Sequence, residues 1–240
     1  LGRDKLNQPR TNDGIREAIR VHTVARAAAV RARTAAVNEL KAFIVTAKEQ
    51  LRAELRGLRT NKIVIRCSRF RDSAKRPVDE RCTRNAMRAL ARRVQHLEAE
   101  IAEHDAAMKT LIDRAATQLI AERGVGYVTA AAFYLAWSHP GRCHSEAAYA
   151  RLGGTAPVEV TSGQNQDRHR LNRGGDHQLN RALYFVAVTR QRCCPETKDY
   201  MARRTSEGKT EREATRCLKR YIARRVWRLL EHPELHLDKT

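Results

Sequence analysis

GVGYVTAAAF, residues 124–133, and GGTAPVEVTSGQNQDRHRLNRGG, residues 153–175, lie in the stretch that decides the fold of this chain. The first segment predicts a glycine turn that ends one helix and a small-residue helix over Tyr127 to Trp137. The second segment ends at Gly174 and Gly175, which predict a tight turn into a helix from Asp176 to Arg192. Residues before this stretch are typical of long helices, and residues after it of basic helices.

The second segment also contains the one convincing strand pattern. Val158 and Val160 alternate with polar residues, a Ser-Gly-Gln-Asn-Gln-Asp turn follows, and residues 169–172 can return as the partner strand. The sequence therefore predicts a small β-hairpin with Ser162 at its edge, beside a glycine. A Ser-Gly pair in a turn is ordinarily only a turn, so this pattern by itself assigns Ser162 no chemistry.

The glycine turns offer a second chemical possibility. Gly124 and Gly126 precede one helix, and Gly174 and Gly175 precede another. Exposed N–H groups at a helix N-terminus can bind a phosphate without reading sequence. A plain turn between two helices has the same pattern, and both interpretations stay open.

The composition favours a polyanionic partner. The chain has 240 residues, with 47 Lys and Arg against 27 Asp and Glu, a net charge of +20. Most of the excess is arginine, whose planar fork matches phosphate oxygens, so nucleic acid is favoured over a membrane surface. No apolar run approaches ~18 residues, so we expect no transmembrane segment.

Six cysteines are present, without a C-x-x-C pair or a histidine at zinc spacing. This spacing predicts no structural metal site. With no secretory leader in the sequence, we expect reduced thiols and a cytoplasmic protein.

The first half of the chain predicts a helical arm. From Ile15 to Leu58 apolar residues follow heptad spacing, a basic link runs from Arg59 to Pro77, and a second long helix repeats the pattern. The two helices predict an antiparallel coiled-coil hairpin, or arms that pair between protomers. His104 falls in the second seam, either as a register-setting polar residue or as a histidine tolerated near the surface.

Basic residues gather in two places in the second half. Residues 168–192 hold six arginines against one acid, a net of +5, and residues 203–228 hold ten basic and three acidic residues, a net of +7. In the last helix the expected apolar stripe includes Leu218, Tyr221 and Ile222, and Lys219 and Arg220 are placed on the remaining surface. Like-charged clusters are usually solvated faces, but beside a helix N-terminus they favour an anion.

Four ordered segments carry a resemblance to a known family: GVGYVTAAAFYLAW, YARLGGTAPVEVTSG, NRGGDHQLNRALYFVAVTR and EGKTEREATRCLKRYIARRVWRLL. Residues 124–230, about half of the chain, resemble the C-terminal transposase domain of the insertion-sequence-110 family. These are RNA-guided DNA recombinases with an N-terminal RuvC-like domain and a coiled-coil insertion. The RuvC-like domain has no counterpart in this sequence, which begins at Leu1 rather than Met, and we expect a chain that is incomplete without it.

The resemblance implies a mechanism and partners. The family's nucleophilic serine matches Ser162, which would attack a DNA phosphate and form a phosphoserine. The acids that bind Mg²⁺ would lie in the absent RuvC-like domain, so no metal or cofactor is expected in this chain. A bridge RNA would supply specificity, and the protein would act as a homo-oligomer, a dimer or a tetramer.

Basic residues and glycines near Ser162 are the candidate phosphate ligands. A serine hydroxyl needs a base, a metal or stabilisation of the developing charge. His169 is a weak candidate for the base, whereas arginines can stabilise a pentavalent phosphate. The candidate DNA-phosphate ligands are Arg168, Arg170, Arg173, Arg181, Gly124, Gly126, Gly174 and Gly175.

The expected fold is mainly α: a long antiparallel two-helix arm over residues 1–122, then a compact helical transposase domain with a small β-hairpin over residues 123–240. The GVG turn gives this domain a helix-turn-helix-like start. The expected function is that of an insertion-sequence transposase that binds DNA and RNA. Two alternatives remain: a catalytically incomplete module that binds nucleic acid and assembles, and a coiled-coil assembly protein whose charge serves solubility and RNA contact.

Overall fold

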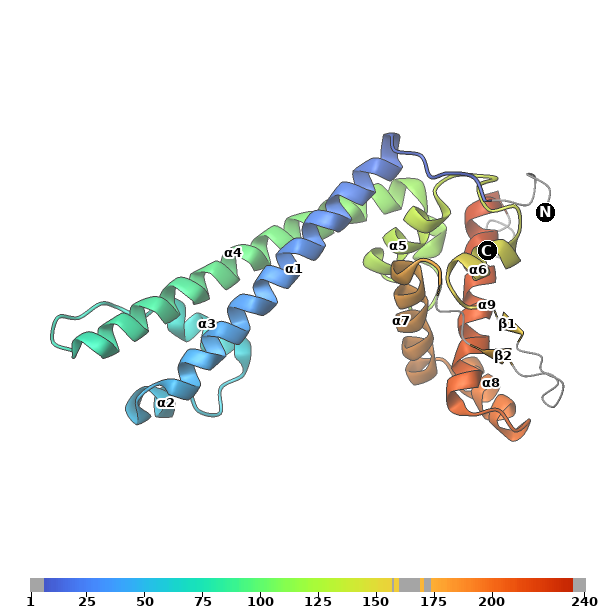
Figure 1. Cartoon of the computed structure of the whole chain (residues 1–240). Helices are drawn as coiled ribbons and strands as arrows, with labels where there is room; N and C mark the ends of the chain where they lie inside the picture. The colour runs from blue at the N-terminus through green and yellow to red at the C-terminus, as the bar shows by residue number, and fades with distance from the viewer. Residues whose placement is uncertain (1–6, 157, 160–168, 171–173, 235–240) are drawn as a thin grey trace. The chain divides into compact units, whose positions relative to one another are not determined.

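The computed structural model describes residues 7–156, 158–159, 169–170 and 174–234 (Figure 1). The chain divides into two compact units. The arm unit is His22–Ala107, and the C-terminal unit combines Leu1–Val21 with Met108–Thr240. Both long helices contribute residues to both units. The boundary near Arg123, expected between functional domains, stays a prediction.

The described residues form a mainly helical fold, as the sequence predicts. Its elements are α1 (Gly14–Thr46), α2 (Glu49–Leu55), α3 (Thr60–Ser68), α4 (Val78–Ala115), a 3-10 turn η2 (Thr117–Leu119), α5 (Tyr127–Trp137), α6 (Glu146–Leu152), β1 (Val158–Glu159), β2 (His169–Arg170), α7 (His177–Cys193), α8 (Pro195–Ser206) and α9 (Glu211–Glu231). None of the helices in this part of the chain is long and apolar enough to cross a membrane.

The arm unit is an intrachain antiparallel hairpin of α1 and α4. Arg26 Nε donates to Asp105 Oδ1 at 2.5 Å, and Arg33 Nη2 donates to Glu98 Oε1 at 2.5 Å, so the residue numbers on the two helices run in opposite directions. His104 lies in this seam, where its Nδ1 is 3.1 Å from Nδ1 of His22. Pairing within one chain is therefore the arrangement found.

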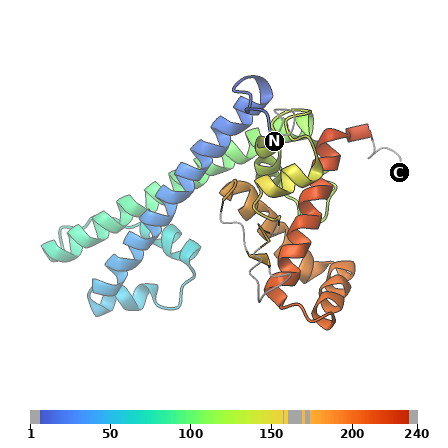
Figure 2. The same cartoon turned by 45° about the vertical axis from the view of Figure 1, so that its right-hand side comes forward.

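Two expectations for the arm need correction. The first expected helix is interrupted after Thr46, and its last turns form the separate helix α2, whose Leu51 and Leu55 are buried. The expected basic link contains the helix α3, which buries Val64 and Cys67. Figure 2 shows α2 and α3 at the end of the hairpin. Apolar burial at this end, not the heptad seam, explains both short helices, because Leu51, Val64 and Met87 share one core.

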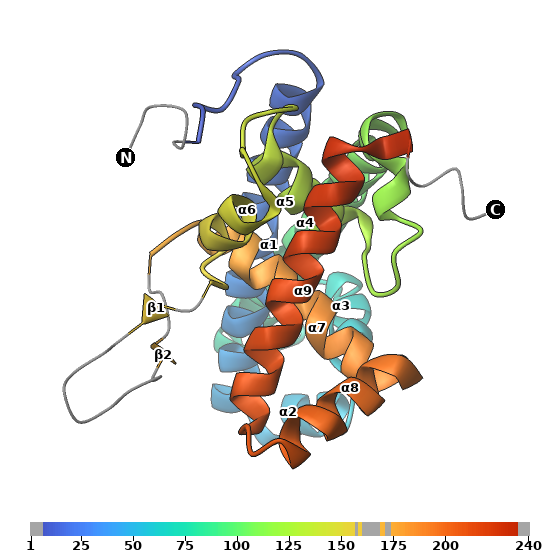
Figure 3. The ribbon, with the colours of Figure 1, turned by 90° about the vertical axis from the view of Figure 1, so that its right-hand side faces the viewer.

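The C-terminal unit packs α5, α6, α7 and α9 around one apolar core (Figure 3). Phe133, Tyr149, Leu183 and Ile222 are completely buried there. The Tyr149 hydroxyl donates to the Phe133 carbonyl at 3.0 Å, which satisfies its polar atom inside the core. The Ser145 side chain caps α6, and Pro195, directly after the C-cap of α7, is the first residue of α8.

The surface of α9 differs from the expected one at two positions. Tyr221, expected in the apolar stripe, is 63% exposed, and Lys219, expected on the surface, is only 8% exposed. The six cysteines, all within the described residues, are free thiols, as expected.

Candidate nucleic-acid interface

The segment that carries Ser162 leaves the helical core at a tightly bonded junction between α6 and α7. The Asp176 N–H donates to the Leu152 carbonyl at 2.7 Å, and the Thr155 N–H donates to the Ala150 carbonyl at 3.0 Å. Gly175 has φ +110°, and a Cβ there would lie 2.5 Å from the Leu152 carbonyl oxygen. Only glycine fits at this position, for both its backbone angle and its close approach. We call these bonds the hairpin base.

A short antiparallel strand pair lies beyond the hairpin base. Val158 pairs with Arg170, and Glu159 pairs with His169. Two residues of each predicted strand are therefore paired, and the predicted turn between them lies outside the described residues. Figure 3 shows β1 and β2 at the edge of the helical core.

The N-terminus of α7 is capped from within the chain. Asp176 Oδ1 accepts the Leu179 N–H at 2.9 Å, and Arg10 forms an ion pair with the same carboxylate. One of the N–H groups that the sequence offers to a phosphate is therefore already bound. Gly174, just before this cap, is exposed.

A buried polar chain joins the hairpin base to α9. Lys219 Nζ donates to Asn180 Oδ1 at 2.7 Å, and Asn180 Nδ2 donates to the Gly153 carbonyl at 2.6 Å. Burial lowers the pKa of Lys219, because a buried ammonium is costly without a counter-ion. Sequence reasoning missed both residues, since neither has a motif; the position of Lys219 directly after the buried Leu218 is the only signal.

The predicted catalytic residues are only partly placed. Ser162, Arg168 and Arg173 lie outside the described residues. Arg170 is placed through its backbone in β2. Their assignment to catalysis and phosphate binding stays a prediction.

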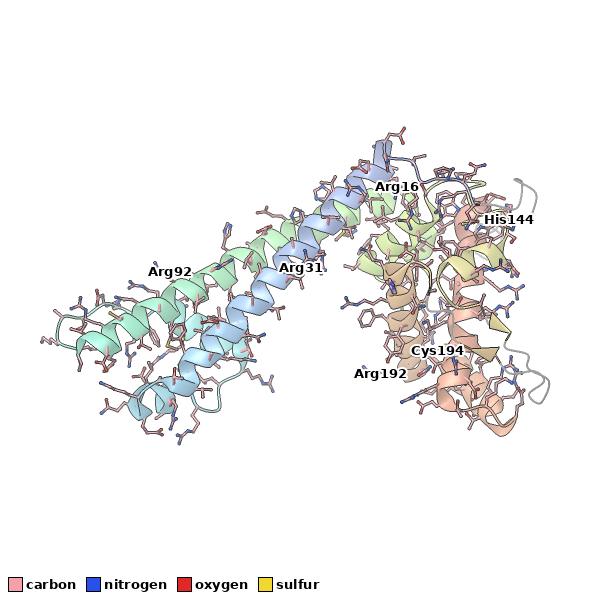
Figure 4. All side chains as sticks on the ribbon, in the orientation of Figure 1. Arg16, Arg31, Arg92, His144, Arg192 and Cys194 are labelled. Carbon is pink, nitrogen blue, oxygen red and sulfur yellow. The ribbon has the colours of Figure 1, made fainter. Side chains whose placement is uncertain are left out.

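Arg181 is exposed on the outer face of α7. Its guanidinium lies 5.4 Å from the centre of the Phe185 ring. Tyr184 and Phe185 are 49% and 48% exposed, so this face presents aromatic rings beside a positive charge. Farther along α7, Arg192 is also exposed (Figure 4). Such a surface can contact both phosphates and bases.

The Gly124–Gly126 turn has structural partners of its own. The Gly126 N–H donates to Thr129 Oγ1 at 2.9 Å, and the Val125 N–H donates to the Glu122 carbonyl at 3.0 Å. Gly124 has φ +83°, and a Cβ there would meet Thr189 of α7 at 3.4 Å. The turn therefore fits a packing role, and phosphate binding by these glycines stays a prediction.

Several exposed arginines of the C-terminal unit have no ion-pair partner among the described residues. They lie on α6, α7 and α9. These residues are Arg151, Arg181, Arg212 and Arg220. By contrast, Arg228 Nε donates to Glu146 Oε2 at 2.6 Å and ties α9 to α6. Unpaired surface arginines are available to a polyanion, whereas paired ones stabilise the unit.

The described residues contain no group of three His, Cys, Asp or Glu side chains able to hold a metal ion. They therefore offer no ligand set for the Mg²⁺ site that the family resemblance implies for a RuvC-like domain.

Two comparisons with known proteins bear on this region. Residues 116–202 match the family model of the IS116/IS110/IS902 transposases. The chain is also 29% identical over 155 residues to the insertion element IS900 uncharacterized 42 kDa protein of Mycobacterium paratuberculosis; these residues are 63% of this chain and 39% of that protein. The chain thus spans about two fifths of this relative. The hairpin base, α5, α6 and α7 all lie within the part of the chain that is similar to an IS110-type transposase domain.

Proposed function

We propose that this chain is part of an insertion-sequence transposase and that Ser162 attacks a DNA phosphate. The observation that carries the proposal is the match of residues 116–202 to a transposase family, because these residues include Ser162 and its neighbouring arginines. The hairpin base adds support, because it fixes both ends of the segment in which Ser162 lies.

The proposed step exchanges one phosphodiester for another. Ser162 Oγ forms a bond to phosphorus, the bond from phosphorus to the leaving sugar oxygen breaks, and that oxygen takes up a proton while the serine hydroxyl loses one. Arg168, Arg170 and Arg173 stabilise the extra negative charge of the pentavalent phosphate. Arg181 and the glycine turns hold the flanking DNA backbone.

The resemblance further suggests partners for the whole protein. We propose that a bridge RNA selects the DNA, that a RuvC-like domain supplies the Mg²⁺ site, and that the protein acts as a homo-oligomer in the cytoplasm.

A suicide DNA substrate tests the chemistry. The chain is incubated with this substrate, bridge RNA and Mg²⁺, with and without an added RuvC-like domain, and covalent protein–DNA adducts are mapped by mass spectrometry. We expect an adduct on Ser162 that Ser162→Ala abolishes, with DNA binding unchanged. Ser206→Ala, on α8, is the matched control and should retain the adduct. An adduct that persists in Ser162→Ala would exclude the serine mechanism.

A second candidate is a nucleic-acid-binding module without cleavage. It is favoured by the net charge of +7 over residues 203–228, which extends beyond the part of the chain that matches the transposase family. Steep salt dependence of binding without an adduct, with or without the RuvC-like domain, would support this candidate.

A further inference from the structure

The arm unit has a strongly basic end, separate from the transposase-like residues. Residues 59–93 contain twelve basic and three acidic residues, a net of +9, whereas the whole chain carries +20. This segment comprises α3, the loop after it and the first part of α4. Nearly half of the net charge of the protein is therefore concentrated in about one seventh of its length.

Four of these basic residues lie on α3 or at its two ends. Lys62 and Arg66 are four residues apart and share one face of the helix, and Arg59 and Arg69 flank it at the N-cap and the C-cap. All four are exposed, while the opposite sector buries Val64 and Cys67. Burial even raises the pKa of the Cys67 thiol to about 11. We call Arg59, Lys62, Arg66 and Arg69 the α3 stripe.

Among the described residues, no acid lies at ion-pair distance from the α3 stripe. Every Asp and Glu in residues 49–93, all of them described, pairs with a basic residue outside the α3 stripe. Glu49 pairs with Arg52 and Arg56, Glu54 with Arg84, Asp72 with Arg81, Asp79 with Lys48, and Glu80 with Arg76 and Arg84. Arg66 acts on Glu54 only at longer range. Folding thus uses every nearby carboxylate and leaves the α3 stripe without a counter-charge.

The α3 stripe is positively charged and has no exposed aromatic ring beside it, which favours the phosphates of a duplex over unstacked bases. The nine residues of α3 rise about 14 Å, and a duplex presents a phosphate about every 3.4 Å along each strand, so basic residues on α3 and at its two ends can face several phosphates. The exposed apolar residue on α3 is Ile65, at 39%, and Phe70 just beyond the helix is buried. Without an exposed aromatic ring the stripe has no platform for unstacked bases.

We propose that the α3 stripe binds the phosphate backbone of a nucleic-acid duplex without sequence preference. The arm then has its own polyanion site, apart from the residues that resemble a transposase domain. This inference does not rest on the proposed function, since binding by α3 requires no cleavage.

Salt titration of the full chain tests the proposal. The variant Arg59→Gln/Lys62→Gln/Arg66→Gln/Arg69→Gln is compared with the wild type on DNA and RNA duplexes of equal length and sequence. Each lost phosphate contact reduces the slope of log K against log salt by about 0.9 on B-DNA. We expect the slope to fall by about 3–4, so that the affinity of the wild type drops about 100-fold more than that of the variant between 50 and 200 mM salt.

A charge-matched variant controls for net charge. Arg31→Gln/Lys41→Gln/Arg92→Gln/Arg114→Gln also removes four positive charges, but from exposed positions on α1 and α4 that form no ion pair among the described residues. Figure 4 labels Arg31 among them. We expect this variant to keep the slope of the wild type. Equal slopes for the α3 variant and the wild type, or equal losses in both variants, would overturn the proposal.

Lysine acylation gives a second measurement that needs no variant. Lys62 in the α3 stripe and Lys41 on α1 are both exposed, so the free protein should acylate at both. Saturating duplex should protect Lys62 several-fold and leave Lys41 reactive. Protection by DNA only or by RNA only identifies the duplex that binds. Protection by single strands alone, or none at all, contradicts a duplex site, whether or not Ser162 forms an adduct.

Discussion

At the scale of single residues, the buried Lys219 beside the hairpin base should make the stability of the folded chain depend on pH. Burial lowers the pKa of Lys219 from its ordinary value of 10.5, so the unfolded chain binds this proton more tightly than the folded chain. The folded state therefore gains stability as pH rises from the folded pKa of Lys219 toward 10.5. The gain is about 1.4 kcal/mol for each pH unit between the two pKa values.

Substitution of Lys219 by methionine should remove this pH dependence. We expect the free energy of unfolding of the wild type to rise relative to that of Lys219→Met between pH 7 and pH 10, measured by urea titration. The exposed neighbour Arg220 is the control, and Arg220→Met should show no such trend. A constant difference between wild type and Lys219→Met across this range would show that the buried ammonium carries no linkage.

The exposure of two residues of α9, Lys219 and Tyr221, was predicted wrongly, and the two cases show the limits of a helical pattern. The apolar stripe through Leu218, Ile222 and Val226 is correct, because period 3.6 fixes the buried face. Lys219 and Tyr221 border that face, and the buried Lys219 donates to Asn180 of α7, a partner 39 residues away in sequence. A single-helix pattern contains no information about such a partner.

At the scale of elements, the junction of α6 and α7 sets how the Ser162 segment leaves the core. We expect Gly175→Ala to destabilise the protein by more than 2 kcal/mol, because its Cβ meets a backbone oxygen in addition to the cost of about 1–3 kcal/mol for a positive φ. The free energy of unfolding by urea measures this. The same substitution should reduce adduct formation on Ser162.

Gly208→Ala separates the cost of the positive φ from the cost of the contact between the added Cβ and a backbone oxygen. Gly208 has φ +84°, and a Cβ there would meet no atom within 4 Å, so only the backbone term applies. Gly175→Ala should therefore cost clearly more than Gly208→Ala. Equal costs would mean that the close contact with Leu152 is relieved by a small shift of the junction.

Element prediction succeeded where local signals were strong and failed where burial came from distant residues. Gly126 and Asp176 mark helix starts in the sequence and in the structure. The helix α3 was missed because its buried residues, Val64 and Cys67, pack against α1, α2 and α4, which no local spacing reports. Of the predicted site, only Arg181 and the glycines can be described in full, because Ser162, Arg168 and Arg173 lie outside the described residues and Arg170 is placed only through its backbone.

At the scale of the whole molecule, the two basic surfaces belong to different units. The α3 stripe lies in the arm unit, and Arg151, Arg181, Arg212 and Arg220 lie in the C-terminal unit. Because the two sets share no ion-pair partner among the described residues, their contributions to binding should add. Glutamine at the second set should also reduce the salt slope by about 3–4 on a long DNA duplex, and the combined variant by about 7.

The combined variant lowers the net charge from +20 to +12, so a purely global charge effect must be excluded. Removing four positive charges from each of two control sites on α1 and α4 that are not part of either surface should leave the slope near that of the wild type. Exposed Arg92, on α4, is one such position (Figure 4). If each surface binds phosphates by itself, the loss of slope in the combined variant should equal the sum of the losses in the two four-residue variants. A combined loss clearly smaller than that sum would contradict independent binding.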